Sequence, residues 1–228
     1  MALKFKFKTI ESFDDLHRFC TPRNRDVYPI FRGVKDAYNH LLVPSIGRVK
    51  LRANASLEKH EARIFKVFKQ SAVPHLNYVP SSDWEWLALA QHHGLPTRLL
   101  DWTYNPLVAA YFAVAHDLPC DSAIYQSNIP DTIDDLLETN PFSVRRVVRY
   151  RPSHITPRII AQRGLFTVHP NPVDPYDAKG ISRAFIPQNA RKKIRDDLYR
   201  YGISNSVVFP GLDGLTAEIA WKYGHTDK

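Results

Sequence analysis

One short stretch of this chain concentrates the side chains that could do chemistry. Near Leu87 the sequence runs from an apolar helix into a turn, and a second helix begins at Pro106. A connection that only joined two packed helices would need few polar groups, because each buried one must find a partner. The stretch therefore predicts either a buried polar network or a binding site. Its polar and aromatic members are Gln91, His92, His93, Thr97, Arg98, Asp101 and Trp102.

Two adjacent histidines, His92 and His93, close the helix that enters this turn. Neighbouring helical residues point about 100° apart, so only one of the two is expected to face a given pocket. A histidine there can act as a base, or hydrogen-bond to a ribose hydroxyl or a phosphate. The alternative is that it satisfies the carbonyl groups at the end of its helix.

Arg98 and Asp101 lie close together on the turn and admit two interpretations. In the first, Arg98 faces a bound anion while Asp101 orients a histidine that acts as a base. In the second, the two charges pair and fix the turn, because buried charges need partners. Gln91 and Thr97 are further ligand-binding candidates, although Thr97 could instead cap the turn. Trp102 is expected either to stack on a base or nicotinamide ring, or to pack in the core.

Arg32 is a second candidate, at the end of a predicted strand, Val27–Gly33. A guanidinium group in that position can grip a phosphate or a carboxylate in a forked geometry. Arg32 is therefore expected to bind an anionic ligand. The alternative is a structural ion pair, with Asp101 as the partner.

The composition describes a folded protein with a basic surface. The 228 residues are 44% apolar and 12% aromatic, enough for one large core or at most two modest domains. The net charge of +8 favours nucleic acid or nucleotide partners, or else serves only solubility. Cys20 and Cys120 form no CxxC pair, so free thiols in a reducing cytoplasm are expected. No apolar run approaches the roughly 20 residues that a membrane-spanning helix needs, so no membrane partner is expected.

Apolar periodicity and capping signals predict an α+β fold: a single domain with a mixed or antiparallel sheet and helices packed on it. No repeat, linker or domain boundary interrupts residues 1–228. The predicted strands are Lys4–Thr9, Val27–Gly33, Ser122–Gln126, Ser143–Tyr150, Leu165–His169 and Arg183–Ile186. The predicted helices are Ser12–Cys20, Ser56–Gln70, Ser82–His93, Pro106–His116, Asp131–Glu138, Arg158–Arg163, Asn189–Tyr201 and Leu215–Tyr223.

Two basic segments with tyrosines nearby predict a surface for RNA or DNA. Lysine and arginine would contact phosphates while tyrosine stacks on bases. The alternative is a solvated helix face and an edge strand kept apart by charge. The basic residues of this predicted surface are Arg145, Arg146, Arg149, Arg151, Arg191, Lys192, Lys193 and Arg195.

The histidines do not predict a metal site, although the chain has ten of them. No pair has the HExxH spacing, and no CxxC companion is present, so no metal is expected. The sequence also has no Gly-x-Ser-x-Gly nucleophile motif and no phosphate-binding glycine loop.

Two segments together resemble a known family. One is Phe31-Arg32-Gly33 followed by Leu42–Arg48, and the other is Trp86–Thr103 followed by Asn105–Ala113. They are similar to the FRG domain, a bacterial family named for its Phe-Arg-Gly signature. The similar segments Ala161–Thr167 and Val208–Gly214 extend the resemblance to about residues 25–222. His92 is preferred to its neighbour as the pocket histidine because of its place in the second segment.

The resemblance implies a protein of bacterial and phage-related genes, some of them linked to anti-phage defence. The strand with Phe-Arg-Gly is also similar to the first motif of arginine-type ADP-ribosyltransferases, in which an arginine helps to hold NAD. By that likeness the fold would be ADP-ribosyltransferase-like, Arg32 would hold NAD, and Glu218 would take the role of a late glutamate that orients the ribose. The chain departs from that pattern, because it has no Glu-x-Glu or Gln-x-Glu pair near its C-terminus.

Two functional hypotheses follow. The first is an enzyme acting on a nucleotide or nucleic acid, in its specific form an NAD-dependent ADP-ribosyltransferase of a bacterial defence or toxin system. NAD would be its substrate, and His92, Asp101 and Glu218 are its catalytic candidates. The alternative is a module that senses a nucleotide or nucleic acid without catalysis. A protein-interaction domain in a toxin or defence system is a third interpretation.

Overall fold

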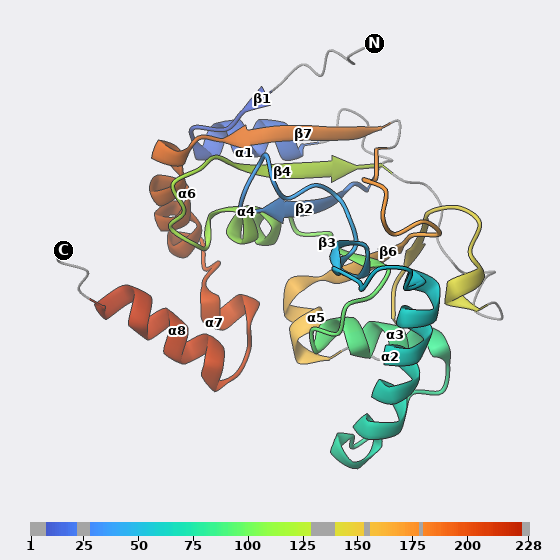
Figure 1. Ribbon diagram of the computed structural model, residues 1–228. Helices are drawn as coiled ribbons and strands as arrows, with labels where there is room; N and C mark the ends of the chain where they lie inside the picture. The colour runs from blue at the N-terminus through green and yellow to red at the C-terminus, as the bar shows by residue number, and fades with distance from the viewer. Residues whose placement is uncertain (1–7, 22–27, 129–139, 153–155, 178–179, 225–228) are drawn as a thin grey trace, which may run out of the picture.

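A single mixed sheet organises the protein. The computed structural model describes residues 8–21, 28–128, 140–152, 156–177 and 180–224. Within them the sheet has seven strands in the order β1-β7-β4-β2-β3-β6-β5 (Figure 1). β1 runs parallel to β7, and all other neighbours are antiparallel. The strands are β1 Lys8–Thr9, β2 Ile30–Val34, β3 Leu99–Thr103, β4 Ser122–Ser127, β5 Val148–Tyr150, β6 Gly164–Val168 and β7 Ile181–Ile186.

The predicted α+β class is confirmed, as are most helices. Ser12, Ser82 and Asn105 each accept a hydrogen bond from a backbone N–H of the helix that follows, as their capping signals indicated. The helices are α1 Phe13–Cys20, α2 Leu57–Ala72, α3 Asp83–His92, α4 Pro106–Val114, α5 Pro157–Gln162, α6 Gln188–Arg200, α7 Asn205–Val208 and α8 Leu212–Tyr223. Short 3-10 turns are η1 Ser45–Arg48, η2 Val73–His75 and η3 Pro141–Ser143. Two predictions, the helix Asp131–Glu138 and the strand over residues 4–7, lie outside the described residues.

The prediction of a turn reaching to Trp102 was wrong. Only the residues around Gly94 turn, and Leu99–Thr103 forms β3, which pairs with β6 at all five of its positions. Its leucines and Trp102 are buried while Asp101 is exposed. The partner strand lies more than 60 residues further along the chain, so no local signal distinguished this strand from a polar loop.

Helices cover the two halves of the sheet separately. Phe31, Ile124 and Ala184 of β2, β4 and β7 pack against α1, α4 and α6. Leu99 and Phe166 of β3 and β6 pack against α2 and α3. Figure 1 shows α4 and α6 beside the β7-β4-β2 half, and α2, α3 and α5 beside the β3-β6 half.

The approach of α4 to the sheet explains the glycine in Phe-Arg-Gly. A Cβ atom on Gly33 would lie 1.8 Å from the carbonyl oxygen of Ala109 in α4. Helix backbone therefore rests directly on strand backbone at this point, which only glycine permits. Phe31 is buried in the core that α4 covers, so two of the three residues serve packing.

Candidate functional site

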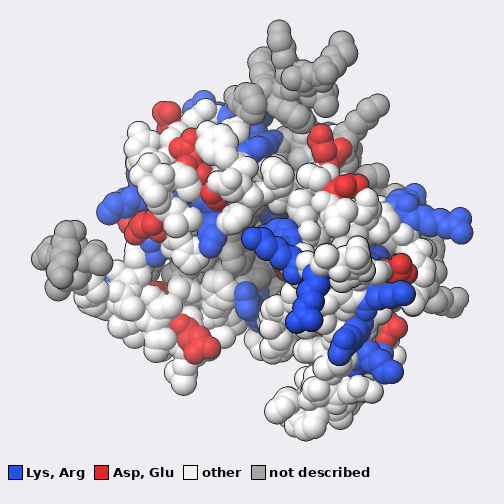
Figure 2. All heavy atoms as spheres, in the orientation of Figure 1, with Lys and Arg blue, Asp and Glu red and all other residues white. Residues whose placement is uncertain are grey.

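The sheet nearly divides between β2 and β3, and a cavity lies beside this division. β2 pairs with β4 at five positions and β3 pairs with β6 at five, but β2 and β3 share only the pair Phe31–Thr103 in the part of the chain described. The cavity has a volume of about 500 Å³ and is lined from β2, β3, the end of α3, α4 and α5. Figure 2 shows Lys and Arg side chains gathered around a hollow on this face. The sequence-predicted residues in the lining are Arg32, Gln91, His92, Asp101 and Trp102.

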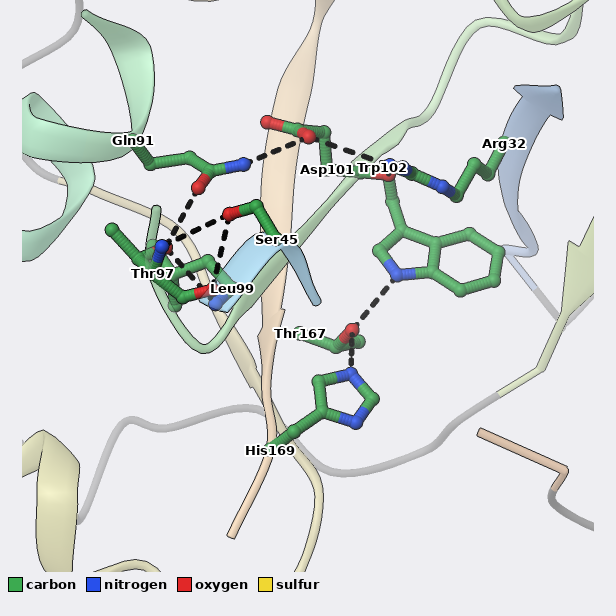
Figure 3. Close-up of polar contacts among 9 residues, drawn as sticks. All are labelled: Arg32, Ser45, Gln91, Thr97, Leu99, Asp101, Trp102, Thr167 and His169. Carbon is green, nitrogen blue, oxygen red and sulfur yellow. Dashed lines mark hydrogen bonds and ion pairs between the residues drawn. The ribbon is translucent and has the colours of Figure 1, made fainter. Parts of the chain in front are cut away.

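Asp101 presents a carboxylate to this cavity. Its side chain is 57% exposed, although the other residues of β3 are buried. Gln91 Nε2 donates to Asp101 Oδ2 at 3.0 Å, and Arg32 Nη1 lies 3.4 Å from the same oxygen (Figure 3). Arg32 Nη1 also donates to the main-chain carbonyl of Asp101 at 2.5 Å. The alternative prediction for Arg32, an ion pair with Asp101, is thus confirmed.

A chain of hydrogen bonds behind Gln91 sets the direction of its amide. Thr97 Oγ1 donates to Gln91 Oε1 at 2.6 Å, so the amide nitrogen faces Asp101 (Figure 3). Ser45 Oγ in turn accepts from the backbone N–H of Thr97 at 2.9 Å. Thr97 is only 1% exposed and does not line the cavity, so it acts on a ligand only through Gln91.

Arg98 lies outside the cavity. Its Nη2 is 2.6 Å from Glu61 Oε2 and its Nε is 3.1 Å from Glu61 Oε1, in a buried two-point ion pair. The guanidinium carbon also lies 4.9 Å from the centre of the Phe142 ring. The interpretation that Arg98 pairs with Asp101 is wrong, because Glu61 of α2 takes that place. The structure likewise gives Arg98 no access to a ligand in the cavity.

Both histidines line the cavity, which corrects the expectation that only one would. His93 is already the C-cap of α3, with φ −91° and ψ 11°, so the helical angle between neighbours no longer applies. The two rings meet edge to face with centroids 5.0 Å apart. Burial, helped by the charges of Arg158 and His93, lowers the pKa of His92 to about 4, against the opposing influence of Asp101. His92 is therefore neutral at pH 7.

Arg158 of α5 is a cavity residue that sequence reasoning missed. Its guanidinium carbon lies 4.6 Å from the centre of the Phe209 ring, which holds the side chain by a cation–π contact. Burial lowers its pKa, while Asp101 opposes that shift. Burial lowers the pKa of a third arginine, Arg48, the charge of Arg32 lowers it further, and Asp101 opposes the shift. No local pattern marks Arg158, because only the fold brings α5 towards β3.

Trp102 forms one wall of the cavity, and a hydrogen bond on its buried side fixes its position. It is 3% exposed, and its Nε1 donates to Thr167 Oγ1 at 2.9 Å. Thr167 Oγ1 in turn lies within hydrogen-bonding distance, 2.8 Å, of His169 Nε2. Burial lowers the pKa of His169 to about 4. Trp102 is thus a core residue with one edge on the cavity.

Glu218 is placed away from the cavity. Its Oε2 accepts a hydrogen bond from the backbone N–H of Ser206 at 2.9 Å, at the start of α7. Hydrogen bonds from the Ser204 and Ser206 side chains lower its pKa. The structure therefore does not bring the three catalytic candidates together: His92 and Asp101 share the cavity, and Glu218 stabilises α7.

The predicted nucleic-acid surface is not continuous. β5 is one edge of the sheet, whereas α6 covers the β7 half, so the two basic segments lie on different parts of the molecule. Arg149 and Arg191 are buried, and Arg191 donates to the carbonyls of Lys35, Cys120 and His116. Arg195 stacks on Trp221 and lies 3.7 Å from Asp117. The exposed members are Arg145, Arg146, Arg151, Lys192 and Lys193.

Two further properties concern only the part of the chain that the structure describes. It contains no group of three His, Cys, Asp or Glu side chains arranged to hold a metal ion. None of its helices is both long and apolar enough to cross a lipid bilayer.

These observations define an α+β protein with a cation-lined cavity at a break in its sheet. Residues 28–122 match the family model of the FRG domain, and the chain carries an FRG domain. The matched range contains Phe31-Arg32-Gly33 and runs through α3, β3 and α4, whereas Arg158 lies beyond it. No curated protein and no solved structure matches the chain. The likeness to the ADP-ribosyltransferase fold stays a prediction.

Proposed function

We propose that this protein is an enzyme that binds a nucleotide in the cavity beside the break between β2 and β3. The observation that carries the proposal is that Arg32, Arg158 and the exposed carboxylate of Asp101 line one cavity of about 500 Å³. That volume is typical of small-molecule sites. Guanidinium groups bind phosphate oxygens in a forked geometry, and the net charge of +8 attracts anions to the surface.

The specific form of the proposal is ADP-ribosyl transfer from NAD to a nucleic acid or protein. Arg32 and Arg158 hold the pyrophosphate. The bond between ribose C1′ and the nicotinamide nitrogen breaks, and the electron pair leaves with nicotinamide. The positive charge that develops at C1′ is stabilised by the carboxylate of Asp101. An acceptor oxygen or nitrogen then bonds to C1′, and its proton passes to water.

His92 has a binding role in this scheme. With a pKa of about 4, its ring is neutral at pH 7 and is a weak proton acceptor. A neutral imidazole can accept a hydrogen bond from a ribose hydroxyl through one nitrogen and donate through the other. His92 therefore orients the ribose next to Asp101.

One observation favours the second candidate, a nucleotide sensor without catalysis. Arg32 and Gln91 already contact the carboxylate of Asp101, and the arginine offsets its negative charge. Among the described residues that line the cavity, Asp101 is the only carboxylate. A site with a single, partly neutralised carboxylate can bind a nucleotide without stabilising a ribosyl cation.

The test compares the wild-type protein with Asp101→Asn in two measurements. Thermal shift with increasing NAD reports binding, because a ligand that binds the folded state stabilises it. Chromatography of NAD incubated with protein and RNA, DNA or protein acceptors reports nicotinamide release. If the protein is an enzyme, NAD should stabilise both forms, and Asp101→Asn should release nicotinamide at least 100-fold more slowly than the wild type. If the protein is a sensor, NAD should stabilise both forms, and neither form should release nicotinamide. If no nucleotide stabilises the protein, both hypotheses are contradicted.

Nucleic acid as the acceptor and a role in bacterial defence or toxin systems remain proposals. The exposed arginines and lysines beside β5 and on α6 support contact with phosphates only as two separate patches. A filter-binding assay over a range of salt concentrations measures how many phosphates the protein neutralises.

A further inference from the structure

A second cavity adjoins the first and differs from it in chemistry. It has a volume of about 290 Å³, and His92 lines both cavities. Its other walls come from the segment between η2 and α3, from α3, and from α5, and include Leu76, Tyr78, Leu89 and Ile159. No arginine or lysine is among its described lining residues.

The one charged residue in this lining, Glu85, is used within the fold. Its Oε2 accepts hydrogen bonds from the backbone N–H of Ser81 at 2.8 Å and from Ser81 Oγ at 3.0 Å. Glu85 is only 9% exposed, so its carboxylate does not dominate the cavity. The cavity is therefore an apolar recess next to a cationic one. A ligand that fills both must have an anionic part joined to an apolar part.

We propose that the second cavity, which we term the ring subsite, binds the flat aromatic ring of the ligand whose phosphates lie between Arg32 and Arg158. This inference rests on the proposed nucleotide binding. A volume of about 290 Å³ suits one ring system better than a whole nucleotide, because sites for larger ligands extend to about 1,000 Å³. The lining of the ring subsite includes two aromatic residues, Tyr78 and His92, and the aliphatic residues Leu89 and Ile159. Aromatic and aliphatic side chains together favour a flat ring.

The ring is either the adenine or the nicotinamide of a dinucleotide, and three ligands distinguish these sources. ADP-ribose lacks nicotinamide, nicotinamide mononucleotide lacks adenine, and inorganic pyrophosphate lacks both. Leu89→Trp fills the ring subsite, while Val67→Trp, on an exposed position of α2, adds the same side chain elsewhere. Tyr78→Ala removes one wall at a position that is 49% exposed, so it tests the subsite if Leu89→Trp does not fold.

The readout is the affinity of each ligand by titration calorimetry. We expect Leu89→Trp and Tyr78→Ala to weaken binding of one ring-bearing ligand at least tenfold, and to leave pyrophosphate binding and the Val67→Trp control unchanged. If affinity falls for ADP-ribose alone, adenine occupies the ring subsite. If it falls for nicotinamide mononucleotide alone, nicotinamide occupies it. Unchanged affinity for both, or an equal loss for pyrophosphate, overturns the ring subsite.

A different result would overturn the proposed nucleotide site itself. Arg158→Gln removes a cation from the first cavity and does not alter the lining of the second except at their common border. If Arg158→Gln binds all three ligands as the wild type does, the phosphate site is overturned. If it weakens all three while Leu89→Trp and Tyr78→Ala weaken none, only the ring subsite is overturned.

Discussion

Arg32 Nη1 donates a hydrogen bond to the main-chain carbonyl of Asp101 at the place where the ladder between β2 and β3 has ended, with an N–O distance of 2.5 Å. A side chain thus supplies the donor that a neighbouring strand would otherwise provide. The same nitrogen lies 3.4 Å from the Asp101 carboxylate, and Arg32 Nε is buried without a hydrogen-bond partner among the described residues. Arg32 therefore holds the break in the sheet together and borders the cavity beside it.

Replacing Arg32 tests both of these roles. We expect Arg32→Ala to lower the free energy of unfolding by about 1–3 kcal/mol, because the Asp101 carbonyl loses its donor. The same change should weaken nucleotide binding at least tenfold. Chemical denaturation and thermal shift with ADP-ribose measure the two effects. Lys192→Ala, which removes an exposed cation of α6, serves as the control and should change neither. Wild-type stability and affinity in Arg32→Ala would contradict both roles.

Gly33 should not tolerate any side chain. In Gly33→Ala the new Cβ would meet the carbonyl of Ala109 at 1.8 Å, so α4 must move away from β2. We expect a loss of more than about 3 kcal/mol of stability, or insoluble protein, since overpacking on backbone cannot relax through a side chain. Gly180→Ala is the matched control, because that glycine has a φ of +98° but open space around it. The control should cost about 1 kcal/mol, and an equal loss in both variants would contradict the close packing of α4 as the reason for Gly33.

The buried ion pair between Arg98 and Glu61 should govern stability and not catalysis. Glu61→Gln leaves an uncompensated guanidinium in the core, so we expect a loss of about 3–5 kcal/mol. The double variant Glu61→Leu/Arg98→Met removes both charges and should be more stable than Glu61→Gln. Denaturation midpoints compare the stability of the three forms. Thermal shift with NAD then tests whether the folded double variant still binds the ligand. Loss of ligand binding by a well-folded double variant would show that Arg98 acts on the ligand.

Stability should fall as the pH falls from 6.5 towards 4. The pKa of His169 is lowered from an ordinary 6.5 to about 4, chiefly by burial, so the unfolded chain takes up a proton in this range and the folded chain does not. The stabilising difference is complete above pH 6.5 and is lost as the pH falls to about 4. His92, with its pKa lowered to about 4, contributes in the same direction. For the buried His169 the loss is on the order of 3 kcal/mol.

Unfolding free energies at pH 7.5, 5.5 and 4.5 check this prediction. His169→Gln removes one titrating group and should flatten the slope between pH 6.5 and 4.5. His75→Gln, at an exposed position of η2, should leave the slope as in the wild type. Identical slopes in wild type and His169→Gln would show that His169 does not hold its neutral form in the folded state.

Local signals identified most elements but not how the segments meet. The capping residues Ser12, Ser82 and Asn105 act over a few neighbouring residues, so the helices that follow them were predictable. β3 was not, because its strand character depends on pairing with β6. α7 is a single turn, and its N-cap residue Ser204 makes no side-chain hydrogen bond to it. The burial and the partners of charged side chains likewise depend on segments that are distant in the sequence. Arg191 looks like a surface residue in a basic helix, yet it is buried against three carbonyls of distant segments.

The order of amino acids was enough to predict the α+β class, to find the FRG resemblance, and to single out the segment from Gln91 to Trp102. These conclusions rest on apolar periodicity, capping and residue order, which need no knowledge of distant contacts. Which side chains share a cavity depended on contacts between segments that are distant in the sequence. The tertiary structure joined Arg32, His92 and Asp101 with Arg158, turned Arg98 towards Glu61 and placed Glu218 at α7. The reason is physical: a charged side chain takes the nearest partner in space, and the fold alone sets that distance.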